Sequence, residues 1–318
     1  MRTSAARLFG MEWSGLASAI ALGVLALAIS SPAFLTEFNL YVALRSLCVP
    51  LLVAYAQLVV LSVGQMNLSV GALGGLVAIA FGGMMEVFGL SAAIAAPLAL
   101  AIGALGGWIN GFLTVATGIS GFIITLATGS AFAGVNLGVT KAIPFYHMPA
   151  DVTAFGTGRV SIFPFLIAIP ALASAILALL FARTVVGRQM LAVGGNAHAA
   201  ALSGIATGRT IILAHMLSGA LAAAAAVLAV AQLGSAQPTI GADWLLISFA
   251  APIIGGAALA GGHVSVVGAL LAVLLIALIE NGMVLVSVDQ YWMQFVLGAL
   301  IVAAVGLNRW RAVASGAG

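Results

Sequence analysis

Long apolar runs separated by short polar segments make up most of this chain. The run from Leu16 to Ser30 is continuous rather than alternating, and a membrane-spanning helix needs about 20 mostly apolar residues. Strands of a membrane barrel would instead alternate apolar and polar residues over about 10 positions. The pattern therefore predicts an all-α polytopic membrane protein with about ten transmembrane helices, at 13–35, 40–62, 66–87, 90–114, 120–140, 162–182, 210–232, 244–261, 264–287 and 291–308.

Composition supports this class. Hydrophobic residues make up 64% of the chain and charged residues 5%, whereas a soluble domain carries about 25% charged residues. The 39 glycines fit membrane helices, in which small residues let backbones approach closely. The ten basic residues lie scattered between the predicted spans, a distribution that fits membrane topology and not nucleic-acid binding.

The basic residues also predict an orientation, because Lys and Arg concentrate on the cytoplasmic side of a membrane. An even number of spans places both termini on one side, which then carries seven of the ten: Arg2, Arg7, Arg183, Arg188, Arg209, Arg309 and Arg311. The other side receives Lys141 and Arg159, with Arg45 near the outer end of the second span. We therefore expect cytoplasmic N- and C-termini, a cytoplasmic loop at 183–209 and an outer loop at 141–161.

The loop at 183–209 is the one long polar interruption of the apolar sequence. Asn196 is a good helix N-cap and Gly204 a good C-terminal stop, which predicts a short helix between them. The apolar face of this helix is mostly alanine and too weak to anchor in lipid headgroups. Docking into a groove on another protein is therefore favoured over an interfacial helix.

Two segments of the chain resemble each other. LSVGQMNLSVGAL at 61–73 and ALAGGHVSVVGAL at 258–270 share a glycine and, seven residues later, Gly-Ala-Leu preceded by Val. Both would enter their spans from the cytoplasmic side. Duplicated halves are common among transporters, although such residues also recur by chance in a chain of this composition.

The polar residues inside the predicted spans are neutral. Residues 65–71 place Gln, Asn, Ser and Gly at the start of a span, which fits either a helix cap or a bent helix that lines a polar cavity. Thr125 and Thr128 share a helix face and could join helices or line a pathway. The candidates for lining a pathway are Gln65, Asn67, Ser69, Thr125, Thr128, Asn136 and Asn281, and Asn110 belongs to the same polar set.

No enzyme motif is present in the sequence. The four histidines lack metal-ligand spacing, and there is no GxSxG sequence and no phosphate-binding loop. We therefore expect no catalytic residue, no metal and no ATP bound by this chain. Glu86 and Glu280 lie near the outer ends of spans, and ionisable residues in a membrane often carry function. An ion-coupled secondary transporter is thus the alternative to a subunit driven by a partner.

Four short motifs follow one another along the chain. The first two are Asn67-Leu68-Ser69-Val70-Gly71 and Phe122-Ile123-Ile124-Thr125-Leu126. The third comprises Gly187-Arg188, Ala192 to Asn196 and Ala199 to Ile205, and the fourth comprises Ile254-Gly255-Gly256 and Gly261-Gly262. Together, and over almost the whole length, they resemble the permease subunit of bacterial ABC sugar importers of the ribose, xylose and galactose branch.

This resemblance implies a single permease domain over residues 1–318 in the bacterial inner membrane, with 141–161 as a periplasmic loop. It implies a second permease copy, cytoplasmic ATP-binding subunits that carry the ATP and Mg²⁺, and a periplasmic solute-binding protein. The solute would be a small neutral monosaccharide or polyol. The residues implied in coupling to the ATPase are Arg188, Gly194, Gly195, Asn196, His198, Ala199, Ala200 and Gly204.

The chain departs from the family pattern at two places. Asn67 stands where many relatives carry Asp, which removes a charge from the pathway. Ala197-His198 replaces the usual Pro-Glu, and Ala201 replaces a basic residue. The first departure bears on solute specificity, and the second suggests a dedicated ATPase partner.

Overall fold

Six helical stretches are long and apolar enough to cross a bilayer in the part of the chain that the computed structural model describes, residues 14–289 and positions 292, 294–296, 298–299 and 302. They are α3 with α4 (Glu37–Ser46 and Cys48–Ser62), α6 (Ala92–Thr117), α7 (Gly121–Thr140), η1 with α9 (Phe165–Ile167 and Ala168–Arg183), α12 (Thr207–Leu233) and α14 (Val266–Leu285). Three shorter apolar helices are α2 (Ser14–Ser30), α5 (Val70–Glu86) and α13 (Trp244–Ile254). An all-α multi-pass membrane protein is thereby confirmed.

These helices match the first nine predicted spans in order. The tenth predicted span, 291–308, lies mostly outside the described residues, as do Arg2, Arg7, Arg309 and Arg311. The number of ten spans and the location of both termini therefore stay predictions.

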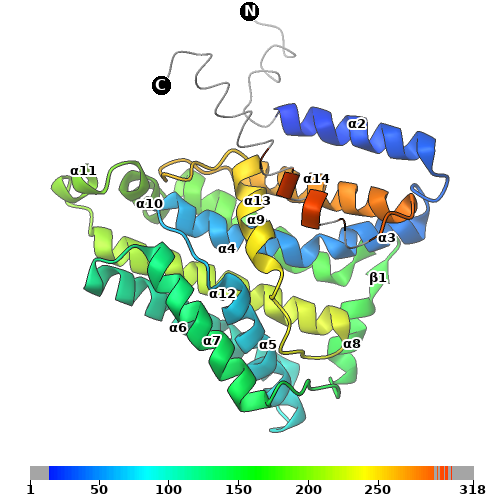
Figure 1. The fold of residues 1–318 in the computed structure, drawn as a ribbon, viewed down its shortest axis with the longest axis horizontal. Helices are drawn as coiled ribbons and strands as arrows, with labels where there is room; N and C mark the ends of the chain where they lie inside the picture. The colour runs from blue at the N-terminus through cyan, green and yellow to red at the C-terminus, as the bar shows by residue number, and fades with distance from the viewer. Residues whose placement is uncertain (1–13, 290–291, 293, 297, 300–301, 303–318) are drawn as a thin grey trace, which may run out of the picture.

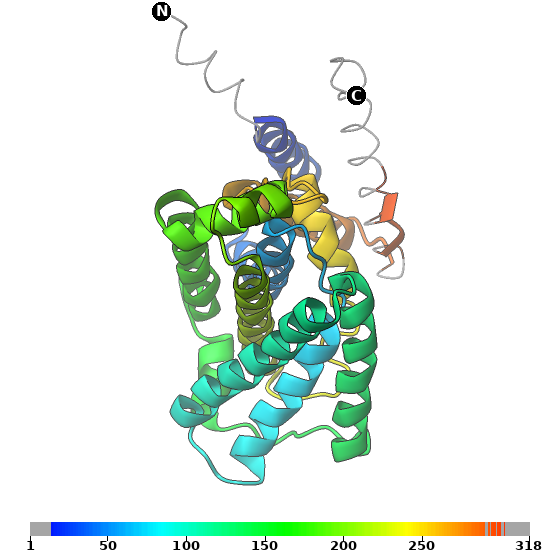
Figure 2. The same cartoon turned by 90° about the vertical axis from the view of Figure 1, so that its left-hand side faces the viewer.

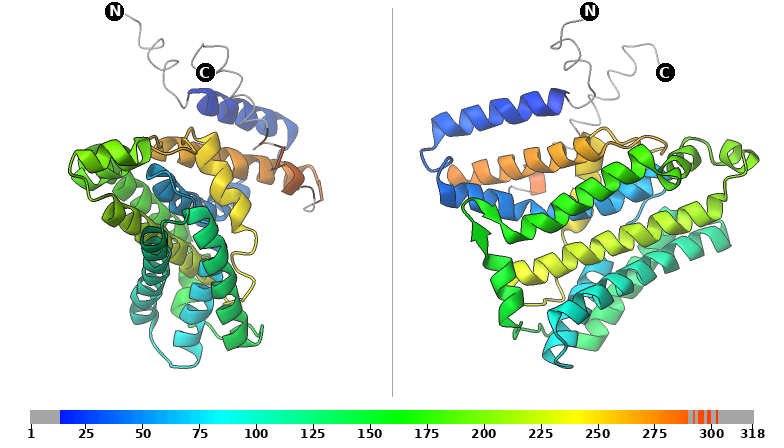
Figure 3. Two further views of the ribbon diagram at one scale, coloured as in Figure 1. Left: turned by 60° about the vertical axis from the view of Figure 1, so that its left-hand side comes forward. Right: turned by 180° about the vertical axis from the view of Figure 1, so that it is seen from behind.

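The long helices lie side by side, so the molecule has two distinct ends (Figures 1 and 3). One end carries α10 (Val185–Gly195) and α11 (Ala197–Leu202) and is called the α11 end; Figure 2 looks onto it. The other, the α8 end, carries α8 (Ala150–Thr157) and the antiparallel pair β1 (Arg159–Val160) and β2 (Phe163–Pro164). The 183–209 and 141–161 loops, which charge assigns to different sides of the membrane, thus lie at opposite ends.

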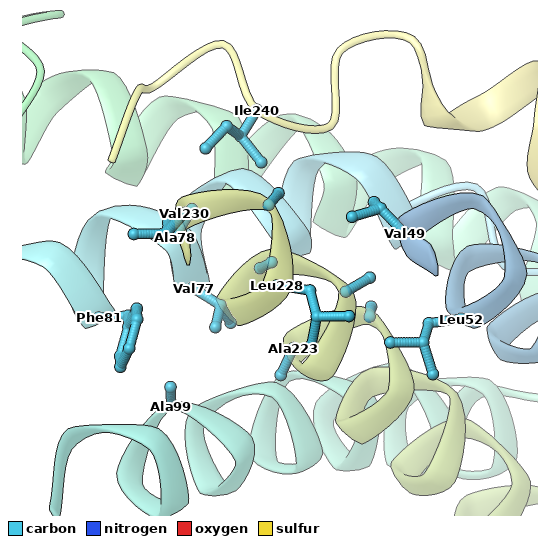
Figure 4. Close-up of a cluster of buried hydrophobic side chains, with 14 of the residues drawn as sticks. Val49, Leu52, Val77, Ala78, Phe81, Ala99, Ala223, Leu228, Val230 and Ile240 are labelled. Atoms are coloured by element: carbon cyan, nitrogen blue, oxygen red, sulfur yellow. The ribbon is translucent and has the colours of Figure 1, made fainter. Parts of the chain in front are cut away.

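Glycines bring α6 and α12 into backbone contact. Gly103, Gly107 and Gly111 recur every fourth residue on one face of α6. A Cβ on Gly107 would overlap the carbonyl oxygen of His215, and one on Gly111 would lie 2.7 Å from the Cα of Ile212. Such small-residue faces let membrane helices pack closely. α12 consequently lies at the centre of the bundle, where its apolar side chains join those of α4, α5 and α6 (Figure 4).

One predicted span is wrong in extent. A continuous span was expected at 244–261, but α13 ends at Ile254 and has 11 residues. At 1.5 Å per residue it is about 16 Å long, about half of the hydrocarbon thickness. A non-helical segment at 234–243, mostly turns, precedes it, and α13 runs across the direction of the long helices (Figure 1). Gly234 and Gly241 have φ of 67° and 89°, a left-handed conformation that interrupts a helix and suits glycine.

Candidate transport site

A buried chain of hydrogen bonds connects four parts of the bundle. Asn67, in the loop between α4 and α5, donates from Nδ2 to Ser218 Oγ on α12 at 3.0 Å. The Ser69 hydroxyl donates to Asn67 Oδ1 at 2.7 Å and accepts from Asn110 Nδ2, on α6, at 2.8 Å. Thr128, on α7, donates its hydroxyl to Asn110 Oδ1. We call Asn67, Ser69, Asn110, Thr128 and Ser218 the polar network.

Every connection in the polar network is neutral. Asn67, Ser69, Asn110 and Ser218 are fully buried. In surroundings of low polarity, hydrogen bonds of this kind are strong, and a lost partner is costly. The network therefore holds α6, α7, α12 and the start of α5 in one arrangement.

The loop that precedes α5 also binds the start of α7. The side-chain oxygen of Gln65 accepts a hydrogen bond from the Gly121 amide at 2.9 Å. The Thr125 hydroxyl oxygen accepts from the Leu68 amide at 2.9 Å. Asn67 Oδ1 accepts from the Ser69 amide at 3.0 Å, whereas the Ser69 side chain makes no cap bond to α5. Asn67 thus makes a local backbone bond and a helix-to-helix bond together, while no side chain caps the first turn of α5.

Two of the predicted pathway residues lie apart from this network. Asn136, on α7, donates from Nδ2 to the Pro238 carbonyl, in the non-helical segment at 234–243, at 2.9 Å. Asn281, on α14, exchanges hydrogen bonds of 3.0 and 2.9 Å with Asn39 on α3. It borders a hollow between α2, α3 and α14 whose other lining residues are apolar. The structure therefore groups Gln65, Asn67, Ser69, Thr125 and Thr128 and separates Asn136 and Asn281 from them.

Two residues of this region were missed in the sequence. Ser218 completes the polar network, and His215 lies one helical turn before it on α12. His215 is fully buried, and neither ring nitrogen has a hydrogen-bond partner among the described residues. Its Nε2 lies 3.4 Å from the position of a Cβ on Gly121, beside the amide that Gln65 binds. The sequence signal that could have revealed His215 is the presence of a histidine within the apolar span predicted at 210–232.

Two capped helices form the loop at the α11 end. The Thr184 side chain caps α10 by accepting from the Gly187 amide at 3.0 Å, and Asn196 caps α11 by accepting from the Ala199 amide at 2.9 Å. The second cap and the short helix confirm the sequence prediction, and Gly204 follows with φ of 82°. α10 itself was not predicted; only two of its 11 residues are polar, but three are glycine, which disfavours a helix.

The predicted coupling residues divide by exposure. Ala200 is buried against the bundle, and Gly194 is partly buried. The others are exposed on the outer surface of the loop: Arg188, Gly195, Asn196, His198, Ala199 and Gly204. Leu202, at the end of α11, is 79% exposed, so the loop presents an apolar tip to the surroundings.

A junction of glycines lies beneath α10, formed by Gly64, Gly194, Gly261 and Gly262. A Cβ on Gly194 would overlap the Ser62 carbonyl and the Gly262 nitrogen. A Cβ on Gly261 would lie 2.5 Å from the Gly64 Cα. Gly64 and Gly261 are the equivalent glycines of the two similar segments at 61–73 and 258–270. We call this contact the glycine junction; it joins α10 to both segments at once.

The acidic candidates for ion coupling lie away from the polar network. Glu86 accepts from the His147 amide at 2.8 Å and pairs with its ring at 3.2 Å. His147 is largely exposed, so this pair lies at the surface of the α8 end. Glu280 lies partly buried on α14. No group of three or more metal-ligating side chains occurs among the described residues.

Comparisons with known proteins decide the family. The family described as branched-chain amino acid transport system / permease component matches residues 39–305. The chain belongs to this permease family. No solved structure matches it.

The permease also has close curated relatives. It is 35% identical to the ribose import permease protein of Bacillus subtilis over 90% of this chain and 89% of that protein. It is 33% identical to the D-allose transport system permease protein of Escherichia coli, over 87% and 85%. It is 31% identical to the autoinducer 2 import system permease protein of Photorhabdus laumondii, over 93% and 90%. These relatives confirm the resemblance to ABC sugar-importer permeases, which are transport subunits and not enzymes.

Proposed function

We propose that this permease forms the membrane pathway for a small neutral solute, a monosaccharide or polyol, in an importer driven by ATP hydrolysis on partner subunits. The observation that carries the proposal is the polar network, which is buried, neutral and located where four helical elements meet. Amides and hydroxyls suit the hydroxyl groups of a sugar, since they both donate and accept hydrogen bonds. The ribose and allose permeases among the relatives support the same solute class.

The proposed assembly assigns the two ends of the permease to different partners. Cytoplasmic ATP-binding subunits would dock on the exposed residues of α10 and α11, and the ATP and Mg²⁺ would bind to those subunits. A periplasmic solute-binding protein would deliver the solute at the α8 end. A second permease copy would complete the membrane unit in the bacterial inner membrane, with about ten helices per copy, two related halves and both termini in the cytoplasm.

The alternative function, ion-coupled secondary transport, needs a buried ion or proton site. Glu86 does not provide one, because its carboxylate is bound to His147 at the surface of the α8 end. Glu280 is thus the one remaining candidate of the two.

Uptake in proteoliposomes separates the two functions. The permease, its ATPase and its binding protein would be reconstituted together, and uptake of D-ribose and D-allose measured with and without ATP and with a protonophore. We expect uptake that requires ATP, survives the protonophore and persists in the Glu86→Gln, Glu280→Gln double variant. Uptake without ATP that the protonophore or the double variant abolishes would establish the alternative.

A further inference from the structure

The non-helical segment at 234–243, which consists mostly of turns, runs from the α8 end to the level of the polar network. It starts at the α8 end, where Ala236 and Phe145 exchange two backbone hydrogen bonds of 2.9 Å. A Cβ on Gly82 of α5 would overlap Ala236, one on Gly75 would lie 2.7 Å from the Ile240 carbonyl, and one on Gly71 would overlap the Gly241 carbonyl. The segment thus follows α5 for 11 residues, about 16 Å of helix rise. Its Gly241 end lies against Gly71, which is two residues after Ser69.

Two sides of this segment have opposite character. Ala236, Ile240 and Trp244 are buried, and Ile240 enters the apolar cluster at the centre of the bundle (Figure 4). The other side leaves Thr239 and Asp243 exposed and Gln237 partly exposed. Irregular backbone and a charged side chain at membrane depth do not face hydrocarbon; they occur where protein or a water-filled cavity covers them.

Unused hydrogen-bond acceptors lie along the segment. The Asp243 side chain precedes α13 but makes no cap bond to it. Asn136 anchors the segment through Nδ2, yet its Oδ1 is buried and has no partner among the described residues. The free acceptor that the exposed side of the segment offers is therefore the Asp243 carboxylate.

We propose that the exposed side of residues 237–243 forms the solute-binding wall of the pathway, with Asn136 holding the segment in place through its bond to Pro238. The Asp243 carboxylate accepts hydrogen bonds from the hydroxyl groups of a neutral polyol, and the Thr239 hydroxyl donates or accepts. The wall leads the solute from the α8 end down to Ser69 and the polar network. The inference that the solute is a polyol rests on the proposed function. The inference that the exposed side of the segment faces water, here called the water-filled face, rests on the structure of the segment.

Cysteine accessibility tests the wall directly, because Cys48 is the only cysteine of the chain. In a Cys48→Ala background, Thr239→Cys and Asp243→Cys would be treated with a charged, water-soluble methanethiosulfonate in the reconstituted importer. Leu105→Cys is the control, since Leu105 lies mid-way along α6 and is 56% exposed. A thiol in hydrocarbon forms no reactive thiolate, so we expect positions 239 and 243 to react at least about tenfold faster than position 105.

Solute protection and uptake complete the test. We expect D-ribose or D-allose to slow labelling at 239 and 243, and Asp243→Asn to lower uptake while leaving expression and thermal stability in detergent intact. Labelling no faster than at Leu105→Cys would overturn the water-filled face. Labelling that neither sugar slows would overturn the binding wall. The labelling result does not depend on ATP-driven uptake, so the two proposals fail separately.

Discussion

Asn67 shows how a single side chain can replace a family residue without leaving a buried group unsatisfied. Its Oδ1 accepts two hydrogen bonds from Ser69, and its Nδ2 donates to Ser218. The Ser218 hydroxyl can rotate and donate instead of accepting. An aspartate here would thus face three donors, an arrangement that stabilises a carboxylate.

The stability of variants at Asn67 should therefore depend on whether the new side chain can form hydrogen bonds and not on its size. We expect Asn67→Asp to fold and to keep most of the thermal stability, whereas Asn67→Leu should lose roughly 1–3 kcal/mol because Ser69 and Ser218 lose their partners. Thermal unfolding in detergent measures both variants. Ser130→Ala, on the exposed side of α7, is the control. Equal stability of the Leu and Asp variants would contradict the role of the polar network.

At this scale the sequence predicted the types of residue but not their pairings. Gln65, Asn67 and Thr125 stand out because polar side chains are rare in apolar spans. Ser218 and His215 did not, since their environment is set by α6 and by the loop at 63–69, which come together only in the fold. Asn281 stood out equally and pairs with Asn39 instead, because composition does not reveal which face of a helix meets which neighbour.

Among the elements, α10 and α11 carry the proposed coupling, and the glycine junction connects them to the rest of the bundle. Gly194 and Gly195 are adjacent, yet a Cβ on Gly194 would overlap backbone of two other segments, whereas one on Gly195 would meet nothing within 4 Å. The two positions form a matched pair for asking whether α10 must rest on the junction.

We expect Gly194→Ala to reduce ATP-driven uptake by about tenfold or more, equivalent to about 1.4 kcal/mol of lost coupling, because α10 must move off the junction. Gly195→Ala should stay close to wild type. Uptake and ATP hydrolysis by the reconstituted importer give the ratio that defines coupling. A normal ratio in Gly194→Ala, or an equal loss in both variants, would argue against transmission through the junction.

Nine helical elements could be predicted because a long apolar run leaves a helix as the means of satisfying its backbone in lipid. The same argument failed at 234–261. Apolarity does not distinguish a spanning helix from a non-helical segment sheltered by neighbouring protein, and the glycines of α5 that shelter this one come from a distant part of the sequence. α10 was missed for the converse reason, since a helix of 11 residues needs no long apolar run.

Across the whole molecule, the basic loop at 183–209 and the loop at 141–161 lie at opposite ends of the helices. This arrangement agrees with opposite sides of the membrane, while the direction still rests on the distribution of Lys and Arg. Two exposed residues mark the ends: Leu202 on α11, 79% exposed, and Val160 in β1, 66% exposed.

Labelling of these two positions in intact cells should fix the orientation. In a Cys48→Ala background, we expect an impermeant thiol reagent to label Val160→Cys without lysis and Leu202→Cys only after lysis. The buried Cys48 of the wild-type chain supplies the unlabelled control. Labelling of Leu202→Cys in intact cells would reverse the orientation and remove the ATPase docking site from the cytoplasm.

Gly71 and Gly241 constrain each other in a way that reaches beyond packing. A side chain on either would overlap the carbonyl of the other, so no substitution at one position can be compensated by a change at its partner. A saturation mutagenesis screen for growth on the transported solute should therefore find both positions intolerant, singly and in combination. Nearby exposed positions such as Ala242 should tolerate many residues. Selection could then alter which solute is carried by changing the exposed side of the segment, while the depth of the segment in the membrane stays fixed.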